Sequence, residues 1–139
     1  MIGREDVKAL VARELEIISD PERRRALEAL LTEPEPRERE WSWGRPPRRV
    51  AYWRVGVSPK EDMELAFCPE GPGPEFPWCF LLTDEDDFGI DAQWNWYLEE
   101  AFVRSGLWKG PTRGMDEAYH LPPEKRFGTS TDENGPGAG

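Results

Sequence analysis

The sequence predicts a single α+β domain with an N-terminal αα-hairpin, an antiparallel sheet of about four strands, one C-terminal packing helix and a disordered tail. Three observations support this prediction. Apolar residues recur at helical spacing in the first 32 residues, and beyond residue 40 the period changes to two. Two apolar runs also mirror each other about a Gly/Pro block. With 139 residues, such a domain can bury about two-thirds of the surface of its unfolded chain.

Residues 1–32 are expected to form a helical hairpin that packs on the main domain. The stretch from Arg4 to Ser19 places apolar side chains at helical spacing, namely Val7, Leu10, Val11, Leu15 and Ile18. Asp20 and Pro21 then supply an N-cap and a first-turn proline for a second helix, which should end before Pro34. Because neither helix can bury its apolar stripe alone, the pair is expected to dock on the sheet.

Residues 33–40 are predicted to be an extended linker. Their sequence, Glu-Pro-Glu-Pro-Arg-Glu-Arg-Glu, has no apolar residue and contains two prolines. The α+β core is then expected to cover residues 40–108, beginning with a short strand at Glu40–Trp43. A second strand follows from Arg49 to Val57, where apolar and polar residues alternate.

The segment from Met63 to Thr83 predicts a β-hairpin with a stiff Gly/Pro loop. Folded symmetrically about Gly73 and Pro74, it pairs Leu65 with Leu82, Phe67 with Phe80, and Cys68 with Cys79. Phe67 and Phe80 then face the core. The opposite face is too apolar for open solvent, so helices or the tail are expected to cover its residues Ala66, Cys68, Cys79 and Leu81.

A third helix is predicted from Trp96 to Ser105, with Asn95 as its N-cap and Gly106 as its stop signal. Beyond it the apolar pattern fails. Residues 109–139 are therefore expected to be an irregular tail, disordered from about residue 128, where the composition becomes rich in Gly, Ser, Thr and acids.

The composition indicates which kind of binding partner and which cellular compartment to expect. A net charge of −10 favours a protein partner with a basic surface and argues against direct nucleic-acid binding. Two cysteines are too few for a disulfide scaffold and indicate a reducing compartment. The N-terminus shows no signal-peptide pattern, and no apolar run approaches the ~20 residues that span a bilayer. We expect a cytoplasmic protein that has no membrane partner.

The sequence has no recognisable catalytic or metal-binding motif. It lacks a nucleophile elbow, a phosphate loop and a dinucleotide fingerprint, so we expect no enzyme, no cofactor and no catalytic residue. A zinc site needs about four ligands, and the single histidine, His120, lies in the tail. Cys68 and Cys79 could form a disulfide or half of a metal site, but we interpret them as small buried hydrophobes.

Charges are distributed unevenly along the chain. Six arginines lie between Arg37 and Arg54, whereas the stretch from Lys60 to Glu100 has twelve acids and one lysine. The arginines are predicted to pair with those acids, inside the protein or across an interface. The run at residues 84–87 lacks EF-hand spacing and indicates a solvated turn. Its acids and two on the hairpin loop are the candidate contacts for a basic partner: Asp84, Glu85, Asp86, Asp87, Glu70 and Glu75.

Four short segments carry a resemblance to a known group of proteins: Trp41-Ser42-Trp43-Gly44, Ala66-Phe67-Cys68, Gly71-Pro72-Gly73-Pro74 and Pro77-Trp78. With them, the stretch from Trp41 to Trp108 resembles small acidic bacterial immunity-type proteins, which have a tryptophan-rich sheet and are encoded near secreted polymorphic toxins. The resemblance implies a binding protein that blocks the active surface of its partner and has no catalytic residues of its own.

A toxin that cleaves nucleic acid must present a basic cleft, which an acidic loop can occupy. Three other functions stay open. An acidic nucleic-acid mimic of the anti-restriction type would need carboxylates spaced along an elongated face. A small enzyme would need a cleft with converging carboxylates and a perturbed pKa. An assembly subunit would need a large apolar interface.

Overall fold

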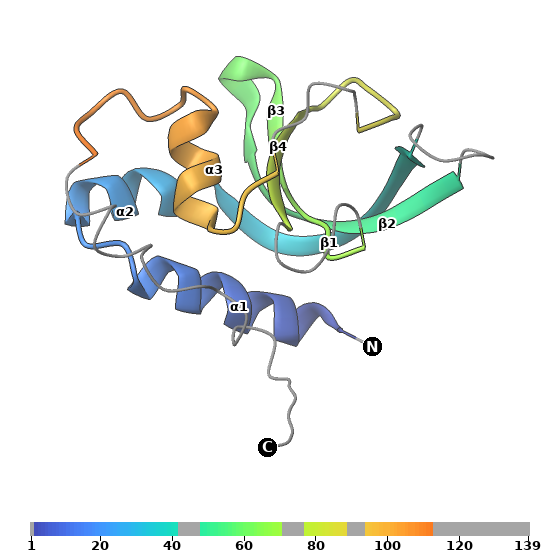
Figure 1. The fold of residues 1–139 in the computed structure, drawn as a ribbon, viewed down its shortest axis with the longest axis horizontal. Helices are drawn as coiled ribbons and strands as arrows, with labels where there is room; N and C mark the ends of the chain where they lie inside the picture. The colour runs from blue at the N-terminus through green and yellow to red at the C-terminus, as the bar shows by residue number, and fades with distance from the viewer. Residues whose placement is uncertain (1, 42–47, 71–76, 89–93, 113–139) are drawn as a thin grey trace.

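The computed structural model describes residues 2–41, 48–70, 77–88 and 94–112 (Figure 1). In these residues it shows helices and a four-stranded antiparallel sheet with the strand order β1-β2-β3-β4, which confirms the predicted α+β class. The elements are α1 (Arg4–Glu16), α2 (Pro21–Glu28), β1 (Leu31–Trp41), β2 (Arg48–Ser58), η1 (Pro59–Glu61), β3 (Met63–Phe67), β4 (Trp78–Leu82) and α3 (Leu98–Arg104). No helix in the described part of the chain is long and apolar enough to cross a membrane. The disorder predicted from about residue 128 lies outside the described residues.

The N-terminal helices form where predicted, but both end early, α1 at Glu16 and α2 at Glu28. Asp20 caps α2 by accepting a hydrogen bond from the backbone N–H of Glu22 at 3.0 Å. The chain turns into β1 at Leu31, which the sequence pattern had placed inside the helix. The backbone N–H of Val57 donates to the carbonyl of Leu30 at 2.8 Å. A Cβ on Gly56 would lie 2.8 Å from that carbonyl oxygen, so glycine permits the close approach.

The predicted linker at residues 33–40 is wrong, because these residues belong to β1, which pairs regularly with β2 from Glu35 to Trp41. The prediction of an extended backbone was correct. Glu40 directs both its N–H and its C=O away from β2, toward residues 86 and 88. Pro36 has the same parity as Glu40 in the regular part of the pairing, so it occupies a position where β2 requires no N–H donor. Pro34 lies in the irregular stretch between Leu31 and Glu35. Prolines that predict a linker are equally compatible with an edge strand.

The β3–β4 hairpin exists, but the predicted register is wrong by two residues. Its pairs are Leu65 with Phe80, Ala66 with Cys79, and Phe67 with Trp78. A shift of two leaves every side chain on its predicted face, so alternation cannot distinguish the two registers. The observed register brings the rings of Phe67 and Trp78 to 4.8 Å between centroids.

Cys68 and Cys79 are therefore not opposite each other. The backbone N–H of Cys68 pairs with the carbonyl of Pro77 at 2.8 Å, and Cys79 lies opposite Ala66. Both cysteines are fully buried, and each thiol donates to a backbone carbonyl, Cys68 to that of Ala51 and Cys79 to that of Phe80. Their burial agrees with the interpretation as small hydrophobes.

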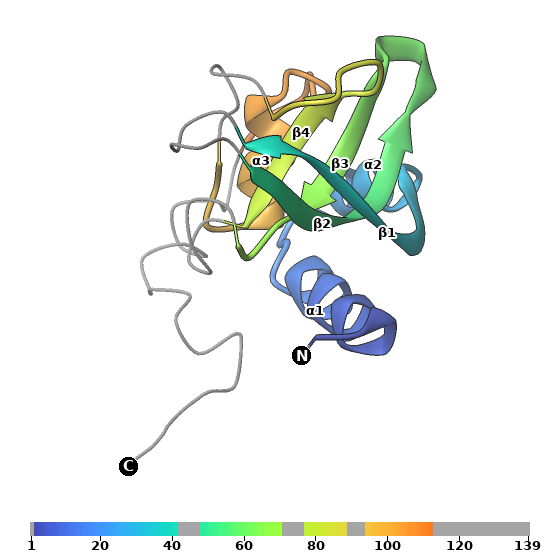
Figure 2. The same ribbon diagram turned by 90° about the vertical axis from the view of Figure 1, so that its right-hand side faces the viewer.

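The sheet is curved, and its two faces are covered in different ways (Figure 1). The helices pack on the convex face, where Val7, Leu27, Leu65, Phe67, Trp78, Leu98 and Phe102 belong to one core cluster. Figure 2 shows α1 below the sheet, with α3 behind β4. The concave face holds a second cluster: Val50, Tyr52, Ala66, Cys68, Cys79, Leu81 and Phe88, with Trp41 and Trp94 against it. We expected helices or the tail to cover this second face. In the described residues, aromatic side chains outside the helices cover it, and most of the predicted tail lies outside the described residues.

Residues 83–88 join the two edges of the curved sheet. After β4, this segment reaches the outer edge of β1, where the N–H of Glu40 donates to the carbonyl of Asp86 at 2.9 Å. The N–H of Phe88 donates to the carbonyl of Glu40 at 3.3 Å. The acidic run at residues 84–87 is thus held between the two edge strands.

The third helix is shorter than predicted. Tyr97 takes the N-cap position of α3, and its N–H donates to the Glu100 carboxylate at 3.2 Å. Asn95, the predicted cap, instead pairs through its backbone with Trp78 of β4. Gly106 ends the helix with a φ of +84°, as its sequence position predicted.

Candidate functional site

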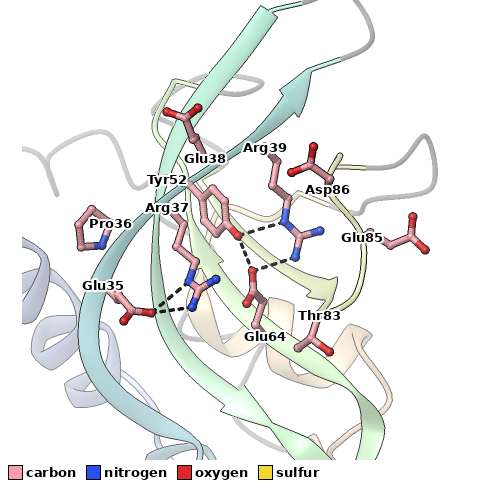
Figure 3. Close-up of a pocket in the computed structure, with 10 residues that line it drawn as sticks. All are labelled: Glu35, Pro36, Arg37, Glu38, Arg39, Tyr52, Glu64, Thr83, Glu85 and Asp86. Atoms are coloured by element: carbon pink, nitrogen blue, oxygen red, sulfur yellow. Dashed lines mark hydrogen bonds and ion pairs between the residues drawn. The ribbon is translucent and has the colours of Figure 1, made fainter.

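A polar hollow of about 480 Å³ opens between β1 and the segment that follows β4 (Figure 3). Alternation of side chains along β1 explains why several of its residues line the hollow. Glu35, Arg37 and Arg39 are alternate residues of β1 and share the concave face of the sheet. The complete lining is Glu35, Pro36, Arg37, Glu38, Arg39, Tyr52, Glu64, Thr83, Glu85 and Asp86.

Three buried residues, Arg39, Tyr52 and Glu64, form the floor of the hollow; each is at most 3% exposed. Arg39 donates from Nε to the Tyr52 hydroxyl at 3.0 Å and from Nη2 to Glu64 Oε2 at 2.8 Å. The Tyr52 hydroxyl donates to the same Glu64 oxygen. The charge of Glu64 is thereby compensated by an arginine that is equally buried.

Arg39 also fixes the acidic segment. Its Nη1 donates to the carbonyl of Asp87 at 2.8 Å, and its Nη2 donates to the carbonyl of Leu82 at 2.8 Å. One side chain from β1 thus holds both ends of the turn that carries the acids. Together with the backbone pairing of Glu40, these bonds anchor the turn to β1 at both ends.

The environment of Tyr52 keeps its phenol protonated at neutral pH. Burial, together with the hydrogen bond to Glu64, raises the pKa of Tyr52 to about 12. The hydroxyl therefore acts as a donor to Glu64.

The walls of the hollow consist of exposed ion pairs. Arg37 donates to Glu35 Oε1 from Nη2 at 2.8 Å and from Nε at 3.0 Å, and Arg54 approaches the same oxygen at 2.8 Å. The hydrogen bond from Arg37 and the charges of both arginines hold the pKa of Glu35 below its ordinary value.

Arg49 joins β1 to the acidic segment. It donates to both carboxylate oxygens of Asp86, at 2.8 and 3.2 Å, and to Glu38 Oε1 at 3.1 Å. Its hydrogen bonds to Asp86 lower the pKa of that carboxyl. Of the six arginines between residues 37 and 54, four pair internally in the described part of the chain: Arg37, Arg39, Arg49 and Arg54. The predicted pairing with the acids between Lys60 and Glu100 is correct for Arg39 and Arg49, whereas Arg37 and Arg54 pair with Glu35 on the neighbouring stretch of β1.

The structure separates the four acids at residues 84–87 into two exposed acids and two that are held by other residues. The side chains of Asp84 and Glu85 are exposed and form no ion pair with any described residue. Asp86 is held by Arg49, and the backbone of Asp87 is held by Arg39 and Glu40. Glu70 is exposed but does not line the hollow, and Glu75 lies outside the described residues.

Sequence reasoning missed the floor of the hollow, although a signal for it exists. Glu64 alternates with Ala66 and Cys68 on a face that is otherwise apolar. A lone carboxylate on a buried strand face requires a buried cationic or donor partner. Only the tertiary structure identifies that partner as Arg39, because Arg39 belongs to the stretch predicted to be a linker.

Comparisons with models of known protein families, with curated proteins and with solved structures find no match to this chain. Within the described residues there is also no group of three or more His, Cys, Asp or Glu side chains that could hold a metal ion. The function of the hollow must therefore be inferred from the chemistry of its own residues.

Proposed function

We propose that this protein is a cytoplasmic protein-binding module, an immunity-type inhibitor that blocks a basic surface of its partner, such as the nucleic-acid-binding cleft of a toxin. One observation carries the proposal: Asp84 and Glu85 are exposed and have no ion-pair partner among the described residues, on a turn that Arg39 and Glu40 hold in place. Unpaired charge on an anchored turn favours binding, because a turn that is already held in place loses less conformational entropy when the partner docks.

The charge of the whole chain supports the same function. With a net charge of −10, the protein attracts a basic partner over a distance, and this attraction speeds association at low salt.

The edge of β1 supports docking through side chains and not through addition of a strand. Its outward carbonyls are occupied where Arg4 donates to Pro34 at 2.9 Å and Arg49 donates to Glu38 at 3.2 Å. Pro36 removes one outward N–H group, and Glu40 is already paired with residues 86 and 88. An edge with so few open backbone groups is a poor template for another strand.

The pKa shifts in the hollow favour binding over proton transfer. General acid–base catalysis works best with a pKa near the operating pH. Here the pKa of Tyr52 rises to about 12, and the pKa values of Glu35 and Asp86 fall below their ordinary values. These three groups therefore keep one protonation state around neutral pH, which suits a fixed pattern of charges.

The other two alternatives have less support among the described residues. The acids around the hollow alternate with arginines, whereas a nucleic-acid mimic needs a continuous row of carboxylates. The exposed large apolar residues are Ile17, Leu82 and Trp96, which come from different elements and do not indicate one large apolar interface.

The proposal can be tested by affinity capture from the native host with three forms of the full chain. The first is the wild type, and the second carries Asp84→Asn and Glu85→Gln. The third carries Glu16→Gln and Glu28→Gln, which removes the same charge from exposed positions on α1 and α2. We expect a basic protein to bind the wild type and the helix variant but not the acidic-segment variant, and salt to weaken its binding.

The captured protein must also lose its own activity when the wild type is bound, because an inhibitor blocks the active surface. Equal capture by all three forms would remove Asp84 and Glu85 from the interface. Capture without inhibition, or no basic protein bound to the wild type, would contradict the immunity-type function.

A further inference from the structure

In the part of the chain that the structure describes, only one oxygen of the buried Glu64 carboxylate accepts hydrogen bonds. Arg39 and Tyr52 both donate to Oε2, and within the described residues no donor reaches Oε1. Glu64 is only 2% exposed, yet it lines the hollow. Figure 3 shows its second oxygen turned away from Arg39 and Tyr52. A carboxylate can accept about four hydrogen bonds, so acceptor capacity remains at the floor of an open site.

The charges around the hollow also leave one acid unmatched. Four of its five acids have an arginine partner: Glu35 has Arg37 and Arg54, Glu38 and Asp86 share Arg49, and Glu64 has Arg39. The fifth, Glu85, has no ion-pair partner among the described residues. It lies at the rim, with its carboxylate directed outward (Figure 3). The hollow is therefore short of one positive charge.

An organic cation fits this arrangement. A volume of about 480 Å³ falls within the range of about 300–1,000 Å³ typical of pockets that hold small molecules. The described acids are not grouped closely enough to hold a metal ion. A long side chain with a cationic end can cross from the rim to the floor, with its stem along the wall and its charge at Glu64.

We propose that the hollow receives one arginine or lysine side chain of the basic partner, whose cationic group donates a hydrogen bond to Glu64 Oε1. Basic neighbours of that side chain then meet Glu85 and Asp84 at the rim. The inference rests on the proposed function, because it names the chemistry that the partner must present. It makes Glu64 a binding residue and Arg39 and Tyr52 the residues that position it.

The experiment uses small probes that carry only the cationic group. The ¹⁵N-labelled full chain is titrated with N-acetyl-arginine amide and, separately, with N-acetyl-lysine amide, which distinguishes a guanidinium from an ammonium. N-acetyl-citrulline amide, which has nearly the shape of the arginine probe but no charge, is the control. We expect saturable amide shifts confined to residues around the hollow with at least one cationic probe, and none with the control.

Two variants test whether binding requires the charge of Glu64 itself. Glu64→Gln keeps the shape of the side chain but removes its charge. It should weaken the affinity for the cationic probe by about tenfold or more, as expected for a buried charged hydrogen bond. Glu28→Gln removes one charge from an exposed position on α2, outside the lining of the hollow, so it should retain binding. In the wild type, the methylene protons next to the cationic group should show intermolecular NOEs to the Tyr52 ring, a readout that does not depend on the folding of any variant.

Equal affinity of the wild type and Glu64→Gln would overturn the inference, as would saturable binding of the citrulline probe or the absence of the NOEs. The result is distinct from that of the capture experiment. If neither cationic probe binds while the Asp84/Glu85 variant still loses its partner, this inference fails and the proposed function stands. If a cationic probe binds but no basic protein is captured and inhibited, the hollow binds cations and the proposed function fails.

Discussion

Two buried arginines, Arg23 and Arg39, make the same kind of ion pair in different parts of the molecule. Arg23 is 0% exposed and donates to Glu99 at the start of α3, while its Nη1 donates to the carbonyl of Pro111 at 2.8 Å. Arg39 is 3% exposed and pairs with Glu64. Arg23 joins the helical layer, and Arg39 joins strand β1 to the acidic segment.

The two pairs differ in what lies next to them. The partners of Arg23 come from the helices and the chain that follows α3, and nearby Glu14 accepts the N–H of Leu98 at 2.9 Å, which ties α1 to α3. The Arg39–Glu64 pair instead lines a hollow of about 480 Å³. A buried ion pair is therefore not by itself a sign of a binding site. The opening beside one of the pairs is what distinguishes them.

The largest expected effect is a difference in the free energy of unfolding between two variants, each of which breaks one of the ion pairs. Arg23→Met leaves the Glu99 carboxylate buried without its partner and should cost about 3–5 kcal/mol. Arg39→Met should cost less, about 1–3 kcal/mol, because water in the hollow can reach Glu64. Urea unfolding of both variants measures the difference.

Equal losses would show that the hollow gives Glu64 no solvation and would remove the distinction between the two pairs. As a control, Glu99→Met added to Arg23→Met should recover most of the loss, because no uncompensated charge then remains buried.

An intermediate effect concerns Tyr52. Its pKa is raised from 10.0 to about 12, so the folded chain holds the phenolic proton more tightly than the unfolded chain does. The associated stability is complete below pH 10 and should fall as the pH rises toward 12. The difference in tyrosinate absorbance between the wild type and Tyr52→Phe measures the ionisation. A transition centred near pH 10 would show that the floor of the hollow is more open than the structure indicates.

The smallest effect concerns the exposed pair of Arg49 and Asp86. Asp86→Asn should lower the melting temperature slightly, and high salt should reduce the difference from the wild type. Asp84→Asn, the matched control in the same run, should leave the melting temperature unchanged or slightly raised because it removes repulsion between neighbouring acids.

The pH dependence of this pair has a definite sign. Arg49 lowers the pKa of Asp86, so the stability from the pair is present above the ordinary value of 3.8 and is lost as the pH falls through the lower, folded-state value. Wild type and Asp86→Asn should therefore converge in acid. A larger loss from Asp84→Asn than from Asp86→Asn would contradict the division of the acidic segment into a held half and an exposed half.

Local patterns in the sequence determined much of the fold. Helical periodicity and the Asp20-Pro21 start predicted α1 and α2, and Gly106 marked the end of α3, where φ is positive. Alternation predicted the faces of β3 and β4 correctly even though the register was wrong. These features depend on residues close together in the chain, where backbone sterics and the burial of one face act directly.

The tertiary structure decided the features that depend on distant partners. The choice between linker and edge strand for residues 33–40 rests on pairing with β2, and the hairpin register rests on the packing of Phe67 against Trp78. The sequence drew attention to the acidic run, but the meeting of Arg39 with Glu64 required β1 to lie beside β2. Side-chain alternation repeats every two residues, so it specifies a face but not the partner across the sheet. The partner is selected by the free energy of packing and of pairing buried charges, which only the folded chain brings together.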